Sequence, residues 1–330
     1  MTEYFQPVIE THRARPSGAM SIGWGWFDRV LIHRRGAAPR LGDTRDVPSD
    51  VMTRLTQDRT SVAGLTMDCP RVMGILNVTP DSFSDGGKFN APDAALARAR
   101  QMIDQGADIL DIGGESTRPG AQEVEIAEEI DRTAPIVAAI RAGSAVPISI
   151  DTRKAPVAHA ALEAGANLVN DVSAMTFDPA LGQVAAQSGA PICLMHAQGS
   201  PETMQNDPRY DDVLLDVYDY LSQRVTAATE MGIPRNQIIV DPGIGFGKTM
   251  DHNLALLRGL SLLHGLGCPI LLGASRKRFI GTIGAAPEAS DRVAGSVAVA
   301  LYGVAAGVQL LRVHDAFETR QALSLQMAMN

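Results

Sequence analysis

The chain of 330 residues contains little cysteine, and its three cysteines stand far apart in the sequence. Cys69, Cys193 and Cys268 form neither a CxxC pair nor a Cys/His cluster with zinc spacing, so no disulfide framework and no structural zinc site is predicted. The sequence also lacks the apolar core of a signal peptide near its beginning and an apolar run of about 18–20 residues, which a membrane-spanning helix needs. These absences predict a cytoplasmic protein in a reducing environment, without a membrane partner.

Positive charge is also scarce, because 29 lysines and arginines face 37 aspartates and glutamates, for a net charge of −8. This acidic balance argues against a nucleic-acid partner. Lysine is rare among the cations: 25 are arginines, and the four lysines are Lys88, Lys154, Lys248 and Lys277. Codon bias can explain the preference for arginine, but it does not explain which four positions kept lysine. The hydrophobic share of 45% is ordinary for a globular protein.

Residues 1–70 differ in composition from the rest of the chain. They hold nine arginines, no lysine and both tryptophans, and proline and glycine interrupt any long periodicity. This pattern predicts an irregular, partly structured N-terminal extension.

A repeated unit begins at Arg71, in which a short apolar run is followed by a turn and then by a helical stretch. The runs are 71–78, 109–113, 147–151, 168–173, 191–196, 238–242, 269–275 and 308–314, and the helical stretches include 92–106, 123–142, 154–165, 211–232, 250–265 and 287–307. Alternation of this kind predicts βαβ units and a parallel sheet. Eight units in about 260 residues predict a (β/α)8 (TIM) barrel catalytic domain over 71–330. A doubly wound sheet is the alternative.

Polar side chains stand at the carboxyl end of nearly every run: Asn77, Asp111, Asp151, Asn170, Asp171, His196, Asp241, Ser275 and His314. In a barrel these ends meet on one face, where barrel active sites lie. The alternative is that each residue caps the helix that follows it. Polar residues at the ends of eight runs together favour a shared site. The acids with Asn170 suit a heterocycle that carries N–H donors, although a metal site or catalytic bases remain open at this point.

One glycine-rich segment invites comparison with nucleotide-binding motifs, and two basic segments suggest an anion site. The segment DPGIGFGKT (241–249) is not a P-loop, because Pro242 stands where the first glycine is required, and Lys248 breaks the dinucleotide fingerprint. The segments SRKR (275–278) and RVH (312–314) follow the last two runs, where barrels often bind phosphate. Among these cations we expect Lys277 and Arg312 to point inward, rather than Arg276 and Arg278.

Two long connections, 77–87 and 114–120, are rich in Gly, Ser, Asp and Pro and carry Phe83 and Arg118. Such a composition suits lids that order over a charged substrate.

Seven segments resemble, in order, the signature segments of the dihydropteroate synthase family: MGILNVTPDSFSDGG (73–87), DIGGESTRPGA (111–121), ISIDTRK (148–154), LVNDVSA (168–174), DPGIGFGKT (241–249), LLGASRK (271–277) and LLRVHD (310–315). They span the whole predicted barrel and leave the extension without a counterpart. The resemblance implies a transferase of folate biosynthesis. It would join 6-hydroxymethyl-7,8-dihydropterin diphosphate to 4-aminobenzoate with Mg²⁺, releasing pyrophosphate and giving 7,8-dihydropteroate.

The resemblance also implies roles for individual residues. The pterin would be held by Asp151, Asn170, Met195, Asp241 and Lys277. The diphosphate would be bound by Asn77, Thr117, Arg118, Arg312 and His314, with Mg²⁺ at Asn77. The 4-aminobenzoate would be framed by Phe83, Thr117, Pro119, Phe246, Ser275 and Lys277. Asp151, Asp241, Lys277 and Arg118 would be catalytic in a dissociative, SN1-like reaction, and a homodimer and inhibition by sulfonamides are expected.

Two other functions remain to be separated from this one. A pterin-dependent methyltransferase barrel would share the pterin-holding acids but should lack the two lids and the SRK segment. An inactive paralogue that binds pterin without turnover should show damage in the lids. Neither departure is present. His196 is expected to be a packed, hydrogen-bonded residue rather than a catalyst.

Overall fold

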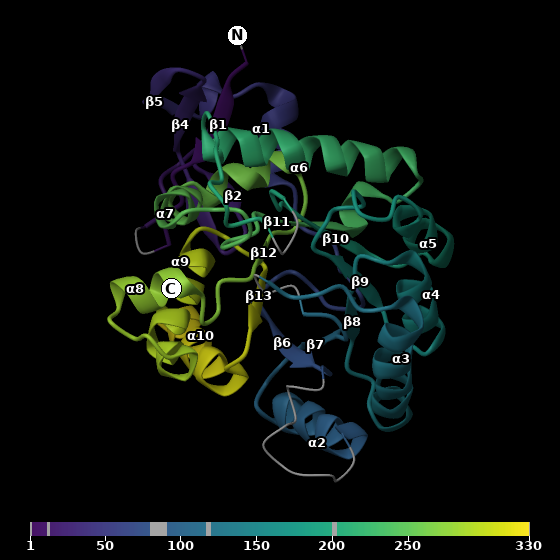
Figure 1. Cartoon of the computed structure of the whole chain (residues 1–330). Helices are drawn as coiled ribbons and strands as arrows, with labels where there is room; N and C mark the ends of the chain where they lie inside the picture. Colours follow the sequence, from purple (N-terminus) through teal and green to yellow (C-terminus); the bar gives the residue numbers. More distant parts are fainter. Residues whose placement is uncertain (1, 12–13, 80–90, 117–119, 200–202, 330) are drawn as a thin grey trace.

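The computed structural model describes residues 2–11, 14–79, 91–116, 120–199 and 203–329 (Figure 1). Its central feature is a parallel sheet with the strand order β11-β10-β9-β8-β7-β6-β13-β12. A parallel bridge between Val240 and Ile270 joins the two end strands, so that the sheet nearly closes into a ring. The strands are β6 (Arg71–Asn77), β7 (Ile109–Gly113), β8 (Ile148–Asp151), β9 (Leu168–Asp171), β10 (Ile192–Met195), β11 (Ile238–Asp241), β12 (Leu271–Leu272) and β13 (Leu310–Val313). The predicted barrel is confirmed, and the doubly wound alternative is wrong.

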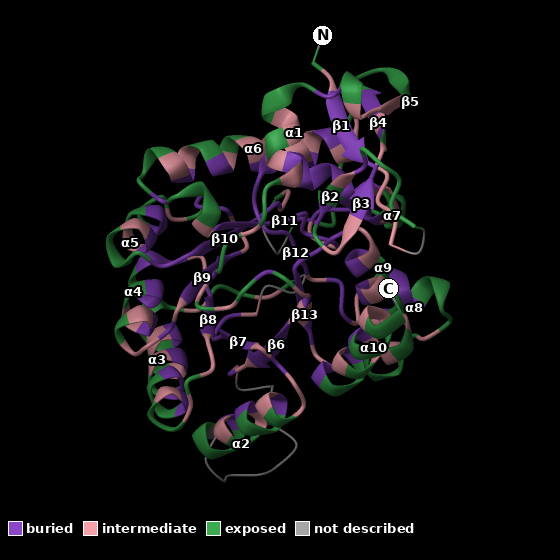
Figure 2. Ribbon diagram, turned by 180° about the vertical axis from the view of Figure 1, so that it is seen from behind, coloured by how far each residue is buried: buried purple, intermediate pink, exposed green. Residues whose placement is uncertain are grey.

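Helices surround this ring (Figure 1), with exposed residues on their outer faces and buried strands inside (Figure 2). They are α2 (Ala91–Asp104), α3 (Ile126–Gly143), α4 (Ala155–Glu163), α5 (Ala180–Ser188), α6 (Val213–Glu230), α7 (Met250–Arg258), α8 (Arg278–Ile283), α9 (Val293–Ala305) and α10 (Ala316–Met329). In the described part of the chain, no helix is both long and apolar enough to cross a membrane.

The helix expected over 250–265 is wrong in its second half. Helix α7 ends at Arg258, and a 3-10 helix follows over Leu260–Leu266. At the break, a Cβ on Gly259 would lie 2.4 Å from Leu214 of α6. The close approach of α6 therefore favours a glycine at this point, and glycine weakens a continuous α-helix.

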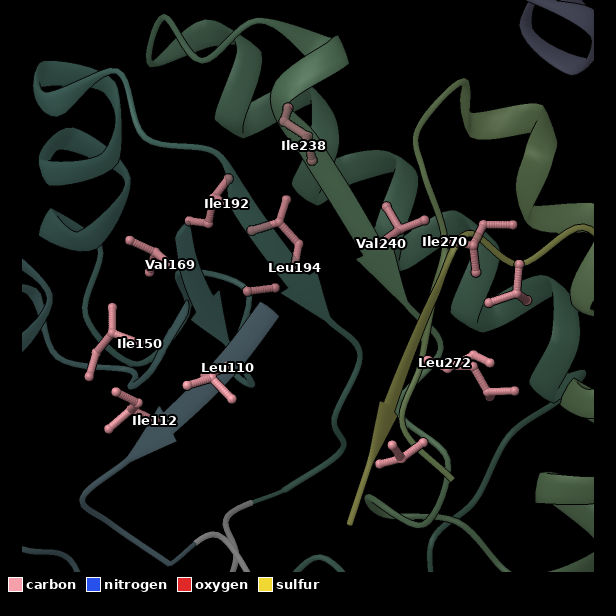
Figure 3. Packing of buried hydrophobic residues seen from close by; sticks show 14 of the residues in the cluster. Leu110, Ile112, Ile150, Val169, Ile192, Leu194, Ile238, Val240, Ile270 and Leu272 are labelled. Carbon is pink, nitrogen blue, oxygen red and sulfur yellow. The ribbon is translucent and has the colours of Figure 1, made fainter. Parts of the chain in front are cut away.

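Side chains alternate between the two faces of the barrel strands, because successive residues of a strand point to opposite sides. Outward residues from neighbouring strands, such as Leu110, Ile150, Val169 and Leu194, pack side by side in the main apolar cluster (Figure 3). Inward residues at the amino ends of the strands form a second cluster: Met73, Ile109, Leu168, Cys193, Ile239, Leu271 and Leu310. The same alternation turns the polar residues near the carboxyl ends toward the barrel interior.

The N-terminal region forms short strands and a helix, to which the sequence analysis had assigned no elements. Strands β1 (Tyr4–Pro7), β4 (Arg29–Arg34) and β5 (Ala37–Asp43) make an antiparallel sheet, β2 (Met20–Ile22) pairs with β3 (Gly25–Phe27), and α1 (Ser49–Thr56) follows. Phe5, Phe27 and Leu55 belong to its own apolar cluster. It is attached to the barrel by hydrogen bonds such as Tyr4 Oη to Asp219 (2.9 Å) and Trp24 Nε1 to the Val304 carbonyl (2.7 Å).

The last part of this region closes the amino end of the barrel. Val62 and Met67 are 1% and 5% exposed and pack against the inward cluster of strand residues. A cavity of about 450 Å³ lies at this junction and is lined in part by Arg59 and His264. Its lining includes Gln309, which precedes β13, so it is at the opposite end of the strands from the polar residues described next.

Candidate functional site

Polar side chains gather inside the carboxyl end of the barrel. Asp111 of β7, Asp151 of β8, Asn170 of β9 and Asp241 of β11 are all buried, with exposed fractions of 0%, 7%, 3% and 4%. Asp111, Asn170 and Asp241 each stand two residues after an inward apolar residue of their strand, so the pleat turns them to the interior. Asp151 follows the outward residue Ile150 and therefore also faces the interior. Such buried polar groups require partners.

Arg312 of β13 supplies the partner for two of these acids. Its Nε donates to Asp111 Oδ2 at 2.6 Å and its Nη2 to Asp151 Oδ2 at 2.6 Å. Asn170 Nδ2 also donates to Asp111, at 3.2 Å. Burial raises the pKa of Asp151 to about 7, although Arg312 opposes this shift. Burial alone would lower the pKa of Arg312, but Asp111 and Asp151 raise it above its usual value.

Asp241 and Lys277 form the neighbouring part of the site. Asp241 accepts a hydrogen bond from the Gly243 amide (2.7 Å), and burial raises its pKa above the usual value. Lys277 Nζ donates to the Ile244 carbonyl and lies 4.1 Å from the centre of the Phe246 ring. Burial lowers the pKa of Lys277 to about 8, against the opposing effect of Asp241. The site thus combines carboxylates with a cation on an aromatic face.

Ser275 and His314 meet at the carboxyl ends of β12 and β13. Ser275 Oγ lies 3.0 Å from His314 Nδ1 and accepts the His314 amide at 3.2 Å. Arg276, between Ser275 and Lys277, instead pairs with Asp315 (Nε to Oδ2, 3.0 Å). Arg278 is exposed at the start of α8. Of the basic residues in 275–278, only Lys277 therefore contacts the glycine-rich loop Gly243–Gly247.

Four residues that the resemblance singled out lie outside the described part of the chain: Phe83, Thr117, Arg118 and Pro119. Lys88, one of the four lysines, lies outside it as well. Of the remaining expected residues, Met195 is 3% exposed at the end of β10, next to Asp241 in the strand register. Asp171 accepts the Ser173 amide at 2.8 Å and the Met175 amide, so it stabilises the turn after β9 and does not cap α5, whose N-cap is Pro179.

His196 is buried among other side chains. It is 5% exposed, its ring packs at 4.8 Å from that of Tyr220, and its Nδ1 lies 2.9 Å from Lys248 Nζ. Burial and, secondarily, the charge of Lys248 lower the pKa of His196 to about 3. It is therefore neutral near pH 7, as a packed residue would be.

Sequence reasoning missed one buried ionic cluster beside the site. Lys154 Nζ contacts Glu115 Oε2 at 2.6 Å and Glu129 Oε2 at 2.8 Å, and Arg153 also donates to Glu115. The scarcity of lysine had marked Lys154 without assigning it a partner. Glutamates inside turn or helix segments give no sequence signal that they are buried.

Oxygen atoms of two side chains border the space beside Gly113. A Cβ on Gly113 would lie 3.6 Å from Asn77 Oδ1 and 3.6 Å from Asp151 Oδ2, so both oxygens border the same space. Among the described residues, no cluster of three or more His, Cys, Asp or Glu side chains could hold a metal alone. Mg²⁺ commonly takes only one or two protein oxygens and completes its shell with water and substrate phosphates.

Comparison with known proteins agrees with this geometry. The family model described as "Pterin binding enzyme" matches residues 73–314. The dihydropteroate synthase of Synechocystis is 51% identical over 244 residues, which are 74% of this chain and 84% of that protein. A solved structure of the Xanthomonas albilineans dihydropteroate synthase with 4-aminobenzoic acid superposes with a TM-score of 0.77 at 46% identity, covering 81% of this chain and 96% of that one. The Yersinia pestis dihydropteroate synthase in a sulfonamide drug complex gives 0.77 at 45% identity, covering 82% and 98%. The chain belongs to the dihydropteroate synthase family of pterin-binding enzymes.

Proposed function

We propose that this protein condenses 6-hydroxymethyl-7,8-dihydropterin diphosphate with 4-aminobenzoate, giving 7,8-dihydropteroate and pyrophosphate in folate biosynthesis. The observation that carries the proposal is the buried group of Asp111, Asp151 and Asn170 around Arg312, beside Asp241 and Lys277. Buried acceptors are costly unless a ligand or a partner satisfies them, and a pterin offers several N–H donors to such acceptors.

In this proposal the pterin ring lies on Asp151, Asn170, Asp241 and Lys277, with Met195 against its face. Asp151 and Asp241 accept hydrogen bonds from ring N–H groups. Their negative charge also stabilises the electron-poor ring as the bond from its methylene carbon to the diphosphate oxygen breaks. The positive charge that develops on the methylene carbon spreads into the ring, where the two carboxylates stabilise it.

The diphosphate would be bound by Asn77, Arg312 and His314, together with Thr117 and Arg118. Arg312 already makes two charge-assisted hydrogen bonds to carboxylates, and its planar group suits phosphate oxygens as well. Mg²⁺ at the Asn77 amide oxygen would neutralise charge on the leaving pyrophosphate. The supporting observation is the pair of oxygens from Asn77 and Asp151 that borders the space beside Gly113.

The 4-aminobenzoate would lie between Phe246, Ser275 and Lys277, with Phe83, Thr117 and Pro119 completing the pocket. The Phe246 ring offers a stacking face, and Lys277 and Ser275 offer donors to the carboxylate. Its amine then attacks the methylene carbon. The arylamine is neutral at pH 7, so the attack needs no strong general base. Arg118, Asp151, Asp241 and Lys277 are the catalytic residues of the proposal.

A coupled pyrophosphate-release assay with both substrates tests the activity. Release that requires 4-aminobenzoate supports the proposal. Binding of the pterin diphosphate without release would instead indicate an inactive paralogue, and methyl transfer from a methylated pterin would indicate a methyltransferase. A sulfonamide should inhibit competitively against 4-aminobenzoate, because it occupies the same pocket. Omission of Mg²⁺ should lower the rate of pyrophosphate release, because the ion would neutralise charge on the diphosphate leaving group.

We further propose a cytoplasmic homodimer that uses the outer faces of α8, α9 and α10. Ile283, Tyr302 and Phe317 are 59%, 49% and 52% exposed and stand one on each of these helices, of which α9 contacts both others. Large apolar side chains exposed on neighbouring helices support a contact surface. Sedimentation of the wild type and of Tyr302→Lys measures the association. A wild-type protein that sediments as a monomer at micromolar concentration contradicts this part of the proposal.

A further inference from the structure

We propose that Lys248 is a positioning residue that holds the loop Gly243–Gly247 against the end of β10 and so sets the place of Phe246 in the 4-aminobenzoate pocket. This inference rests on the proposed function, because the assignment of that pocket to Phe246 is part of it. Lys248 itself contacts neither substrate in the proposal.

The amino group of Lys248 joins two segments that are distant in the sequence. Its Nζ lies 2.9 Å from His196 Nδ1 and 3.3 Å from the His196 carbonyl, at the end of β10. It also donates to the Phe246 carbonyl at 2.9 Å. One side-chain amino group thus contacts three polar atoms, two carbonyl oxygens and one imidazole nitrogen. Lys248 is 3% exposed, and within the described residues it makes no ion pair with a carboxylate.

The loop that Lys248 anchors has little stiffness of its own. Gly243, Gly245 and Gly247 adopt φ angles of +66°, +85° and +63°, which few other residues tolerate. A Cβ on Gly243 would lie 1.8 Å from the His196 carbonyl oxygen, so the loop backbone packs directly on the end of β10. Glycines allow this approach but leave the loop dependent on external hydrogen bonds for a single conformation.

Phe246 connects this anchor to the site. Its carbonyl accepts from Lys248, whereas its ring lies under Lys277 at 4.1 Å from the ammonium. Lys277 also donates to the carbonyl of Ile244 in the same loop. Displacement of the loop would therefore move the Phe246 ring relative to Lys277. The residues that would hold the pterin, among them Lys277, Asp151 and Asn170, lie outside the loop and would stay in place.

The geometry also accounts for lysine at this position. A compact ammonium on a flexible stem can reach three acceptors from one point, whereas a planar guanidinium is larger and directs its donors apart. Burial lowers the pKa of Lys248 well below its usual value, and the nearby Asp241 opposes the shift. This supports a group that is shielded from solvent and retained for its hydrogen bonds.

The test compares the Michaelis constants of the two substrates in Lys248→Met, which keeps the length of the side chain and removes its donors. The KM for 4-aminobenzoate should rise by about tenfold or more, as for the loss of one hydrogen bond from a charged group, while the KM for the pterin diphosphate changes by less than about threefold. Lys248→Arg should not rescue this defect. Equal KM changes for both substrates, or a loss of kcat alone, would overturn the proposal.

Two controls separate this inference from the proposed function and from general destabilisation. Phe246→Ala should raise the KM for 4-aminobenzoate by itself; if it does not, the pocket assignment fails. In the double variant Lys248→Met/Phe246→Ala, the free-energy change calculated from the KM for 4-aminobenzoate should be smaller than the sum of the changes in the two single variants. This is expected because Lys248 acts through Phe246. If Phe246→Ala has its effect and the double variant is fully additive, the positioning role of Lys248 is refuted.

Leu221→Ala, a buried substitution in α6, is the matched control for lost stability. It should lower the Tm without a selective change in either KM. If it selectively raised the KM for 4-aminobenzoate, that KM would report lost stability rather than the position of Phe246, and the proposal would be refuted. If Lys248→Met fails to fold, Tyr210→Phe serves in its place, because the Tyr210 hydroxyl donates to the adjacent Gly247 carbonyl at 2.7 Å. It should raise the same KM by about threefold, and an unchanged value would refute the role of the loop anchors.

Discussion

Replacement of Lys154 by methionine should cause one of the largest single losses of stability in this protein. The ammonium of Lys154 lies between Glu115 and Glu129 and also donates to the Val124 carbonyl at 2.5 Å. The three side chains are only 3%, 5% and 1% exposed. Although burial raises the pKa of Glu115, the hydrogen bond from Lys154 and the other contacts lower it below the usual value. Glu115 and Lys154 are therefore ionised at neutral pH.

The magnitude follows from the partners that remain. In Lys154→Met, Glu115 keeps the hydrogen bond from Arg153 Nε at 2.9 Å. Glu129 keeps the Thr152 hydroxyl at 2.7 Å but no cation among the described residues. Removal of one partner from a buried ion pair costs about 3–5 kcal/mol, and because Arg153 still compensates Glu115, we expect about 3 kcal/mol. Lys154→Met/Glu129→Gln should recover part of this loss, since it removes the uncompensated charge.

The pH dependence gives an independent signature. In the wild type the lowered pKa of Glu115 contributes stability above its usual pKa, and this contribution is lost as the pH falls toward the lowered value. Burial would lower the pKa of Lys154, but hydrogen bonds to both glutamates raise it, so its contribution is present below the usual lysine pKa and is lost at still higher pH. In the variant, a buried carboxylate without a cation favours its protonated form, so stability should decrease from about pH 5 to about pH 8.

Urea unfolding, followed by circular dichroism at both pH values, measures these free energies. Lys154→Met should shift the midpoint strongly at pH 8 and less at pH 5, and the double variant should show a smaller difference between the two. A loss of less than about 1 kcal/mol at pH 8 would refute the reasoning, because it would mean that the charges are screened as at a protein surface.

Three further predictions concern the site and the closed end of the barrel. Asp151→Asn should lower kcat/KM for the pterin diphosphate by about tenfold or more, and a change within about threefold in initial-rate assays would contradict its role. Because the pKa of Lys277 is lowered to about 8, kcat/KM for 4-aminobenzoate should fall as the pH rises above that value. In Lys277→Arg this decrease should occur at a higher pH. A decrease at the same pH in the variant would show that another group causes it. Met67→Ala should reduce the free energy of unfolding by about 2–4 kcal/mol without changing either KM, whereas a nearly unchanged urea midpoint would show that residues 62–67 do not close the core.

Much of the barrel could be predicted because its strands are buried on both sides. Each run from 71–78 to 308–314 contains a β-strand, since continuous apolar segments separated by turn residues carry a strong local signal. The elements of residues 1–70 could not be predicted in the same way. Strands of three or four residues, such as β2 and β3, are too short to show a period, and they depend on contacts such as that of Trp24 with Val304.

The candidate site divides along a similar line. The sequence by itself determined that polar residues stand at the carboxyl ends of the runs, and that lysine was kept at only four positions. Only the tertiary structure decided how the adjacent residues Asn170 and Asp171 divide: Asn170 contacts Asp111 in the interior, whereas Asp171 accepts amides of the turn that follows. Adjacent residues point to opposite sides of a strand or turn, and the ring of strands sets which side is the interior. Partners far apart in the sequence, such as Arg312 and Asp111, which are separated by 201 residues, meet through that closure, and no local pattern records it.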